Sequence, residues 1–193
     1  MSDAAEGVQP VEAPRDRASL ISAIEAGDRA AWEGWLDCSS REDAVHALSQ
    51  LVDDDRLGLL RVLKAERAAE VLELLPRPQA VDASEDLDAP VAADIVEELW
   101  SDDRADLIRE LDAEDAEAIF TELDAETLAD IRKLAAYEED AAGSLMHTEY
   151  LAFRDHITIR ELLANIEANA EAYADYNIQY TYVIDGQDRL VGV

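Results

Sequence analysis

The sequence is poor in cysteine and contains no long apolar run. Its one cysteine, Cys38, excludes an internal disulfide and is typical of a cytoplasmic protein. No stretch approaches the roughly 20 apolar residues that a membrane-spanning helix needs. The N-terminal stretch is polar, acidic and proline-containing, so we expect no signal peptide and interpret residues 1–18 as a disordered acidic tail.

Basic residues are scarce and acidic residues are abundant. The 193 residues include 46 acids against 16 lysines and arginines, giving a formal net charge of −30, and two of those bases are lysines. Nucleic acid and anionic membrane surfaces are bound through basic patches, so neither is a predicted partner. The acids suit either divalent cations or a solvated surface in high salt, where screening weakens self-repulsion. Because they spread along the whole chain, we assign most of them to salt adaptation and a few to a specific site.

Catalytic motifs are missing as well. The chain has no glycine-rich phosphate loop, no nucleophile with a matched base and no His/Cys spacing suited to a metal. Carboxylate pairs occur everywhere in so acidic a chain and indicate little. The sequence therefore predicts no enzyme, no catalytic residues and no cofactor-binding residues.

What the chain does contain is a ladder of leucines at steps of 12 residues. On one continuous helix, successive leucines would be rotated by about 120°, so a single long helix would scatter them around its surface. We therefore expect short helices stacked as an α-superhelical domain over residues 19–136, of a hand that the sequence leaves open. The ladder consists of Leu51, Leu63, Leu75, Leu87, Leu99, Leu111 and Leu123.

Helix start signals recur between the leucines. Asp88, Asp112 and Asp124 each precede proline or acids, and Ser101 precedes two aspartates. A side-chain oxygen before such a first turn is the usual helix opening, so these four residues are predicted N-caps. Upstream, Leu20–Leu36 is predicted as one longer helix. Its tryptophans, Trp32 and Trp35, are expected to pack the end of the stack rather than bind a ligand.

The pattern changes after Met146. Thr158 with Glu161 three residues later is a capping box that opens an amphipathic helix. An aromatic, β-branched stretch then leads into a hairpin turn at residues 185–188. The predicted order is β-α-β-β, in the segments Glu149–Phe153, Thr158–Ala170, Gln179–Ile184 and Leu190–Val193.

This second module, with Tyr182-Val183-Ile184-Asp185 followed by Arg189-Leu190-Val191-Gly192-Val193, resembles about two thirds of a CBS motif. Such motifs normally come in pairs, so residues 147–193 are interpreted as an incomplete CBS motif with uncovered apolar surface. That surface predicts either a homodimer through the CBS region or a longer protein of which this chain is the front part. The residues that often hold a nucleotide ribose would follow Val193, so nucleotide binding is not carried over.

Residues 137–146, from Tyr137 to Met146, form the linker between the two modules and contain Glu138-Glu139-Asp140-Ala141-Ala142-Gly143-Ser144. Together, the helical repeat, this linker and the CBS start resemble the cytosolic front end of the MgtE family of magnesium channels and transporters, over residues 20–193. The resemblance implies a mainly α fold ending in a partial α/β motif. It also implies further CBS and transmembrane portions and a location on the cytoplasmic side of the inner or plasma membrane.

The resemblance further implies regulation by Mg²⁺, held between acidic faces of the two domains so as to favour a closed state. Matched to the family, Asp102 and Asp106 take acidic positions at that interface, and the main-chain carbonyl of Ser144 completes the site. Asp102 and Asp106 lie four residues apart, so they share one helix face. In a second interpretation, Asp102 and Asp103 only favour the helix N-terminus.

A different class of function also fits these features. A stand-alone helical-repeat and CBS module would bind a protein partner and have no transport function. Because α-superhelices of other families have a similar texture, the repeat by itself does not discriminate. A specific response to Mg²⁺ would distinguish the transporter interpretation from this one.

Overall fold

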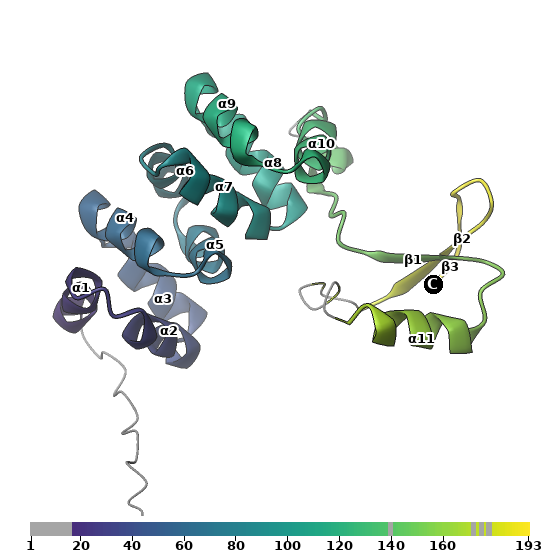
Figure 1. Cartoon of the computed structure of the whole chain (residues 1–193), viewed down its shortest axis with the longest axis horizontal. Helices are drawn as coiled ribbons and strands as arrows, with labels where there is room; N and C mark the ends of the chain where they lie inside the picture. Colours follow the sequence, from purple (N-terminus) through teal and green to yellow (C-terminus); the bar gives the residue numbers. More distant parts are fainter. Residues whose placement is uncertain (1–16, 139–140, 171–172, 174–175, 177–178) are drawn as a thin grey trace, which may run out of the picture.

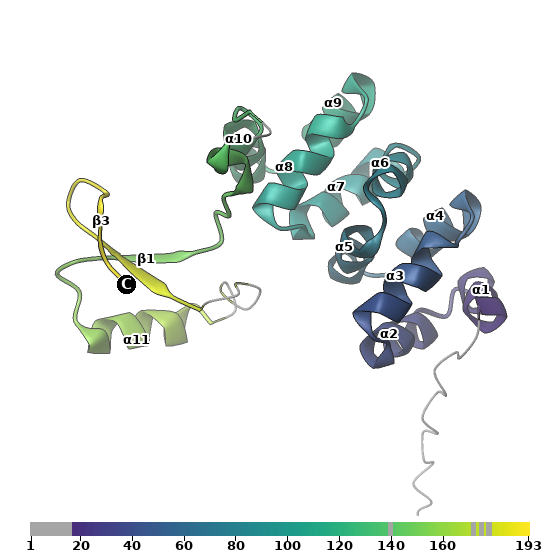
Figure 2. The same cartoon turned by 180° about the vertical axis from the view of Figure 1, so that it is seen from behind.

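The computed structural model describes residues 17–138, 141–170, 173, 176 and 179–193. In these residues, ten short helices stack into a curved superhelix, and a three-stranded sheet with one further helix forms a separate lobe (Figures 1 and 2). This architecture confirms the predicted mainly α fold with a β-α-β-β module. Of the predicted tail, residues 1–16 lie outside the described residues. The stacked helices are α1 (Arg17–Glu25), α2 (Arg29–Cys38), α3 (Arg41–Ser49), α4 (Asp53–Val62), α5 (Ala65–Leu74), α6 (Arg77–Glu85), α7 (Ala89–Glu98), α8 (Ser101–Glu110), α9 (Ala113–Glu122) and α10 (Ala125–Leu134).

The 12-residue step is the length of one structural unit. Each helix from α7 to α10 has ten residues, and α7, α8 and α9 are each followed by a leucine C-cap and a single N-cap residue of the next helix. The leucine backbone is extended, with φ −65 and ψ 153 at Leu111 and φ −70 and ψ 150 at Leu123. Each ladder leucine is at most 8% exposed, so the residue that ends a helix also fills the core. Burying such a side chain stabilises the fold by about 1.5–3 kcal/mol.

Helices that are next but one in sequence pack against each other. α3, α5, α7 and α9 form one row, and α4, α6, α8 and α10 form the other. Small side chains allow these helices to approach closely. Four alanines in the contacts are almost completely buried: Ala68, Ala69, Ala92 and Ala93. The two rows give the stack its curved, two-layered shape.

Two sequence predictions in this domain are wrong in detail. The predicted helix Leu20–Leu36 is broken into α1 and α2, because Gly27 has φ +65 and the side chain of Asp28 caps α2 through Ala31 N–H. Ser101 is the first residue of α8 rather than its N-cap, which is Trp100. The tryptophans pack as predicted: Trp32 is fully buried and its Nε1–H donates to Leu20 O at 3.1 Å.

The lobe contains β1 (Leu151–Arg154), α11 (Ile159–Ala168), β2 (Thr181–Ile184) and β3 (Leu190–Gly192). β1 pairs parallel with β2, and β2 pairs antiparallel with β3. The predicted capping box at Thr158 and Glu161 is present at the start of α11. α11 has no buried residue, and Ile159 and Leu163 are 79% and 59% exposed. In the described part of the chain, no helix combines the length and hydropathy that a bilayer crossing requires.

Candidate functional site

The predicted aspartates lie on the first two turns of α8, beside the segment that leads to the lobe. Asp102 and Asp106 are partly buried, with side chains 20% and 40% exposed. The 3-10 turn Ala142–Leu145, which contains Ser144, packs against α8. The structure therefore brings the helix and the turn that carry the three predicted residues into contact.

Each of the two aspartates has a basic neighbour. His147 Nδ1 lies 3.1 Å from Asp102 Oδ1, and its ring makes an edge contact with Trp100 at 5.9 Å between centroids. Arg109 Nη1 donates to Asp106 Oδ1 from one turn further along α8. Arg109 balances the charge of Asp106, so this site carries less net negative charge than the sequence alone suggests.

Ser144 is 3% exposed and is held by a local turn. Its Oγ donates to Ala141 O at 2.8 Å, and its N–H donates to the same oxygen at 3.0 Å. The adjacent Gly143 lies against the ring of Tyr137, where an added Cβ would come within 2.3 Å of Tyr137 Cδ1. The close approach of ring and backbone explains why glycine stands at this point of the linker.

Asp103 on α8 has a raised proton affinity. Burial raises the pKa of Asp103, and the neighbouring Asp102 carboxylate raises it further, while Arg77 opposes both effects. Burial also raises the pKa of Glu73 on α5, with Asp103 as the leading charge. The negative charge is thus concentrated across two helices and would be relieved by a cation.

Glu73 was not predicted from sequence. It lies in α5, 30 residues before Asp103, and nothing in the local pattern joins the two. Residues 30 apart stand two and a half repeats apart, so the charge of Asp103 acts on Glu73 only in the folded stack.

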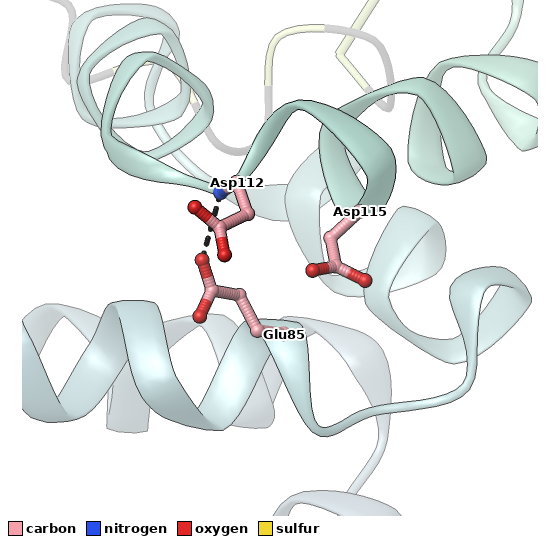
Figure 3. Close-up of side chains that lie close together, drawn as sticks. All are labelled: Glu85, Asp112 and Asp115. Carbon is pink, nitrogen blue, oxygen red and sulfur yellow. Dashed lines mark hydrogen bonds between the residues drawn. The ribbon is translucent and has the colours of Figure 1, made fainter.

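A second group of carboxylates recurs one repeat later. Glu85 at the end of α6 and Asp112 and Asp115 at the start of α9 have carboxylate oxygens within 4.8 Å of one another (Figure 3). Glu85 Oε1 accepts from the backbone N–H of Asp112 at 2.8 Å. Twelve residues later, Glu97 makes the same contact with Asp124 N–H at 3.3 Å. The Glu85 contact is therefore a feature of the repeat and is accounted for without a metal ion.

The segment after the 3-10 turn is fastened to the helical domain. Glu149 Oε1 accepts from Ser101 N–H at 3.1 Å, and Glu149 Oε2 accepts from Ser101 Oγ at 2.8 Å. Thr148 N–H donates to Ser101 Oγ at 2.9 Å, and Thr148 Oγ1 donates to Asp130 Oδ2 of α10 at 3.2 Å. We call these four residues, Ser101, Asp130, Thr148 and Glu149, the seam contact.

Asp102 and Asp106 offer carboxylate oxygens on α8, and the imidazole of His147 lies beside Asp102. Carboxylate oxygens suit hard divalent cations, and Mg²⁺ in particular binds through one or two carboxylates while retaining several waters. The donor set therefore fits Mg²⁺.

The chain has relatives among magnesium transporters. A model of the family described as MgtE intracellular N domain matches residues 39–140, just over half of the chain. Over 67 residues the chain is 43% identical to the magnesium transporter MgtE of Thermus thermophilus. That alignment spans 35% of this chain and 14% of the transporter.

Two solved structures share the fold. The structure of the soluble part of a magnesium transporter matches with a TM-score of 0.75 and 22% identity, over 91% of this chain and 69% of that chain. The cytosolic domain of the Mg²⁺ channel MgtE in complex with ATP matches with a TM-score of 0.76 and 32% identity, over 91% and 71% of the two chains. Both alignments extend well past the matched helical family region into the lobe.

Proposed function

The chain belongs to the MgtE intracellular N domain family, and on this premise we propose that it is the Mg²⁺-sensing regulatory region of a magnesium transporter or channel. Mg²⁺ bound between acidic surfaces of the helical domain and of the CBS region favours the closed state. The observation that carries this proposal is that Asp102 and Asp106 lie on α8 against the linker turn that contains Ser144.

The proposed site follows from the geometry of α8. Asp102 and Asp106 present carboxylates on one face, and the turn of Ser144 packs on the same helix. Asp102 and Asp106 supply anionic oxygens, and the carbonyl of Ser144 supplies a neutral one. The CBS-side ligands would come from portions of the transporter outside this chain.

Repulsion makes this arrangement responsive to concentration. With no cation, the clustered carboxylates destabilise any state that brings more negative charge to them. A bound Mg²⁺ reverses the sign of that interaction and stabilises the compact state by a free energy that rises with the ratio of Mg²⁺ concentration to Kd. In a protein with a net charge of −30, screening by monovalent salt lowers the general repulsion but offers no such site.

The chain would not act alone. The portions that follow in its relatives, including the rest of the CBS region and the membrane part, are its proposed partners, together with a second copy bound through the CBS region. We propose the boundaries 19–136 for the helical domain, 137–146 for the linker and 147–193 for the incomplete CBS motif.

The test is a Mg²⁺ titration of this chain at fixed high ionic strength, followed by thermal unfolding. Mg²⁺ should raise the unfolding temperature more than KCl of equal ionic strength does. The added free energy of unfolding should be about 2.7 kcal/mol when the Mg²⁺ concentration is 100 times the Kd. The double variant Asp102→Asn, Asp106→Asn should be stabilised no more by Mg²⁺ than by KCl of equal ionic strength. Asp94→Asn, at an exposed residue of α7, is the matched control and should retain the larger effect of Mg²⁺.

If Mg²⁺ and KCl act equally on the wild-type chain, the sensing role is wrong for this segment. The interaction module without transport function would then be the better hypothesis. Its motivating features are the exposed apolar residues of the lobe, such as Ile159 and Leu190.

A further inference from the structure

We infer that residues 147–149 move with the helical domain, and that the pivot between this domain and the lobe lies immediately after Glu149. The seam contact is a latch that fixes the segment just after the linker to α8 and α10. This inference goes beyond Mg²⁺ sensing and holds whether or not the α8 carboxylates bind a cation. It moves the mechanical boundary three residues past the linker at residues 137–146.

The first argument is that α8 depends on Glu149 for a cap. Trp100 stands at its N-cap position and provides no side-chain hydrogen bond. In α10, by contrast, Asp124 accepts from the N–H groups of both Glu126 and Thr127. The carboxylate of Glu149 accepts from Ser101 N–H, so a residue 48 positions away satisfies a helix-terminal donor of α8. A carboxylate at a helix N-terminus is also favoured by the helix dipole.

The second argument is that Ser101 joins both sides of the contact. It is 1% exposed, and its Oγ donates to Glu149 while accepting from Thr148 N–H. Loss of Glu149 would leave the buried N–H of Ser101 without its acceptor, which carries a large penalty. Thr148 Oγ1 adds a hydrogen bond to Asp130, so residues 148 and 149 are bound to two different helices.

The third argument is that the residue after Glu149 contacts the lobe instead of the helical domain. Tyr150 is 55% exposed, and its ring contacts Tyr182 of the lobe at 6.0 Å between centroids. A cleft of about 900 Å³ lies between the two parts, with Trp100 on the helical side and Tyr180 and Leu190 on the lobe side. The lobe can rotate relative to the helical domain only if there is open space between them, and this cleft provides that space beside Glu149.

Site-resolved amide hydrogen exchange on the whole chain tests the latch, in KCl with a chelator so that Mg²⁺ plays no part. In the wild type, the Ser101 and Thr148 amides should be protected together. Glu149→Ala should accelerate both by about tenfold or more, and Glu149→Gln should do so less because an acceptor oxygen remains. Glu138→Gln, a matched charge removal in the linker, should change them by less than about twofold. Core amides such as that of Leu59 report that each variant is folded.

A distance measurement completes the test. In a Cys38→Ser background, spin labels at Arg132→Cys on α10 and Arg160→Cys on α11 report the placement of the lobe. Glu149→Ala should broaden this distribution, and Glu138→Gln should not. If Glu149→Ala matches Glu138→Gln in both exchange and distance, or if the wild-type Thr148 amide exchanges at the unprotected rate, the latch is refuted.

Discussion

Neighbours decide what each carboxylate of α8 can do. Asp102 and Asp106 lie one helical turn apart, yet Asp102 lies against His147, just after the linker, and Asp106 against Arg109 of its own helix. Asp103, between them, has its pKa raised by burial and by Asp102. Ser101 precedes them as a predicted cap and instead bonds to Glu149. The chemistry of each residue thus depends on side chains brought in from other elements.

Replacing Asp103 by Asn should stabilise the protein at neutral pH in the absence of Mg²⁺. Burial and the Asp102 carboxylate make the ionised form of Asp103 unfavourable, and the amide removes that charge. After discounting for solvent screening, the gain should be a few tenths to about 1 kcal/mol.

Denaturant unfolding at constant ionic strength measures this change, with Asp94→Asn as the control at an exposed position of α7. The control should shift the midpoint much less. A loss of stability in Asp103→Asn, relative to that control, would contradict the repulsion inferred for α8.

At the scale of elements, the 12-residue unit combines two local signals. A leucine ends the helix in an extended conformation and enters the core, and an aspartate or other residue opens the next helix. The N-caps at this position differ in their bonding. Asp124 caps α10 with two backbone hydrogen bonds, whereas Asp112 makes no side-chain cap bond and its N–H is held by Glu85.

Asp124→Ala should therefore destabilise the protein more than Asp112→Ala. Hydrogen bonds from Thr127 and Glu126 lower the pKa of Asp124. The stabilisation by its carboxylate is consequently present above the ordinary aspartate pKa and is lost as the pH falls through the lowered folded-state value.

Unfolding of the wild type and the Asp124→Ala variant should thus be compared between neutral pH and pH 2. The difference between them should be largest at neutral pH and shrink in acid. A difference that does not depend on pH would mean that the carboxylate charge has no part in the cap.

For the whole molecule, the dominant quantity is the charge. A net charge of −30 on 193 residues produces self-repulsion at every surface of a curved, open stack. Local bridges such as Arg77 with Glu110 join neighbouring repeats, but 16 lysines and arginines cannot balance 46 acids. Stability therefore depends on the solvent as well as on the core.

Raising KCl from 0.1 M to 1 M should increase the unfolding temperature, because the screening length falls from about 10 Å to about 3 Å. The increase should persist in the Asp102→Asn and Asp106→Asn double variant, since it does not depend on the proposed site. Thermal scans over a KCl series measure it. An unfolding temperature that is independent of KCl would refute salt adaptation as the role of the bulk of the acids.

Much of this protein is determined by local sequence. The 12-residue ladder predicts short stacked helices, the capping box at Thr158 predicts the start of α11, and the strand patterns predict the β-α-β-β order. These features depend on periodicity and on side chains a few residues apart. The break at Gly27 was also encoded locally, by a glycine followed by an aspartate cap, and could have been recognised.

Tertiary structure alone decided which residues meet. The charge of Asp103 acts on Glu73 of α5 only in the folded stack, and Glu149 caps α8 because the segment after the linker lies against a residue 48 positions earlier. The physical reason is that helix formation depends on hydrogen bonds within a turn or two. The charge cluster and the latch depend instead on the angles at which successive helices pack, which no local pattern records.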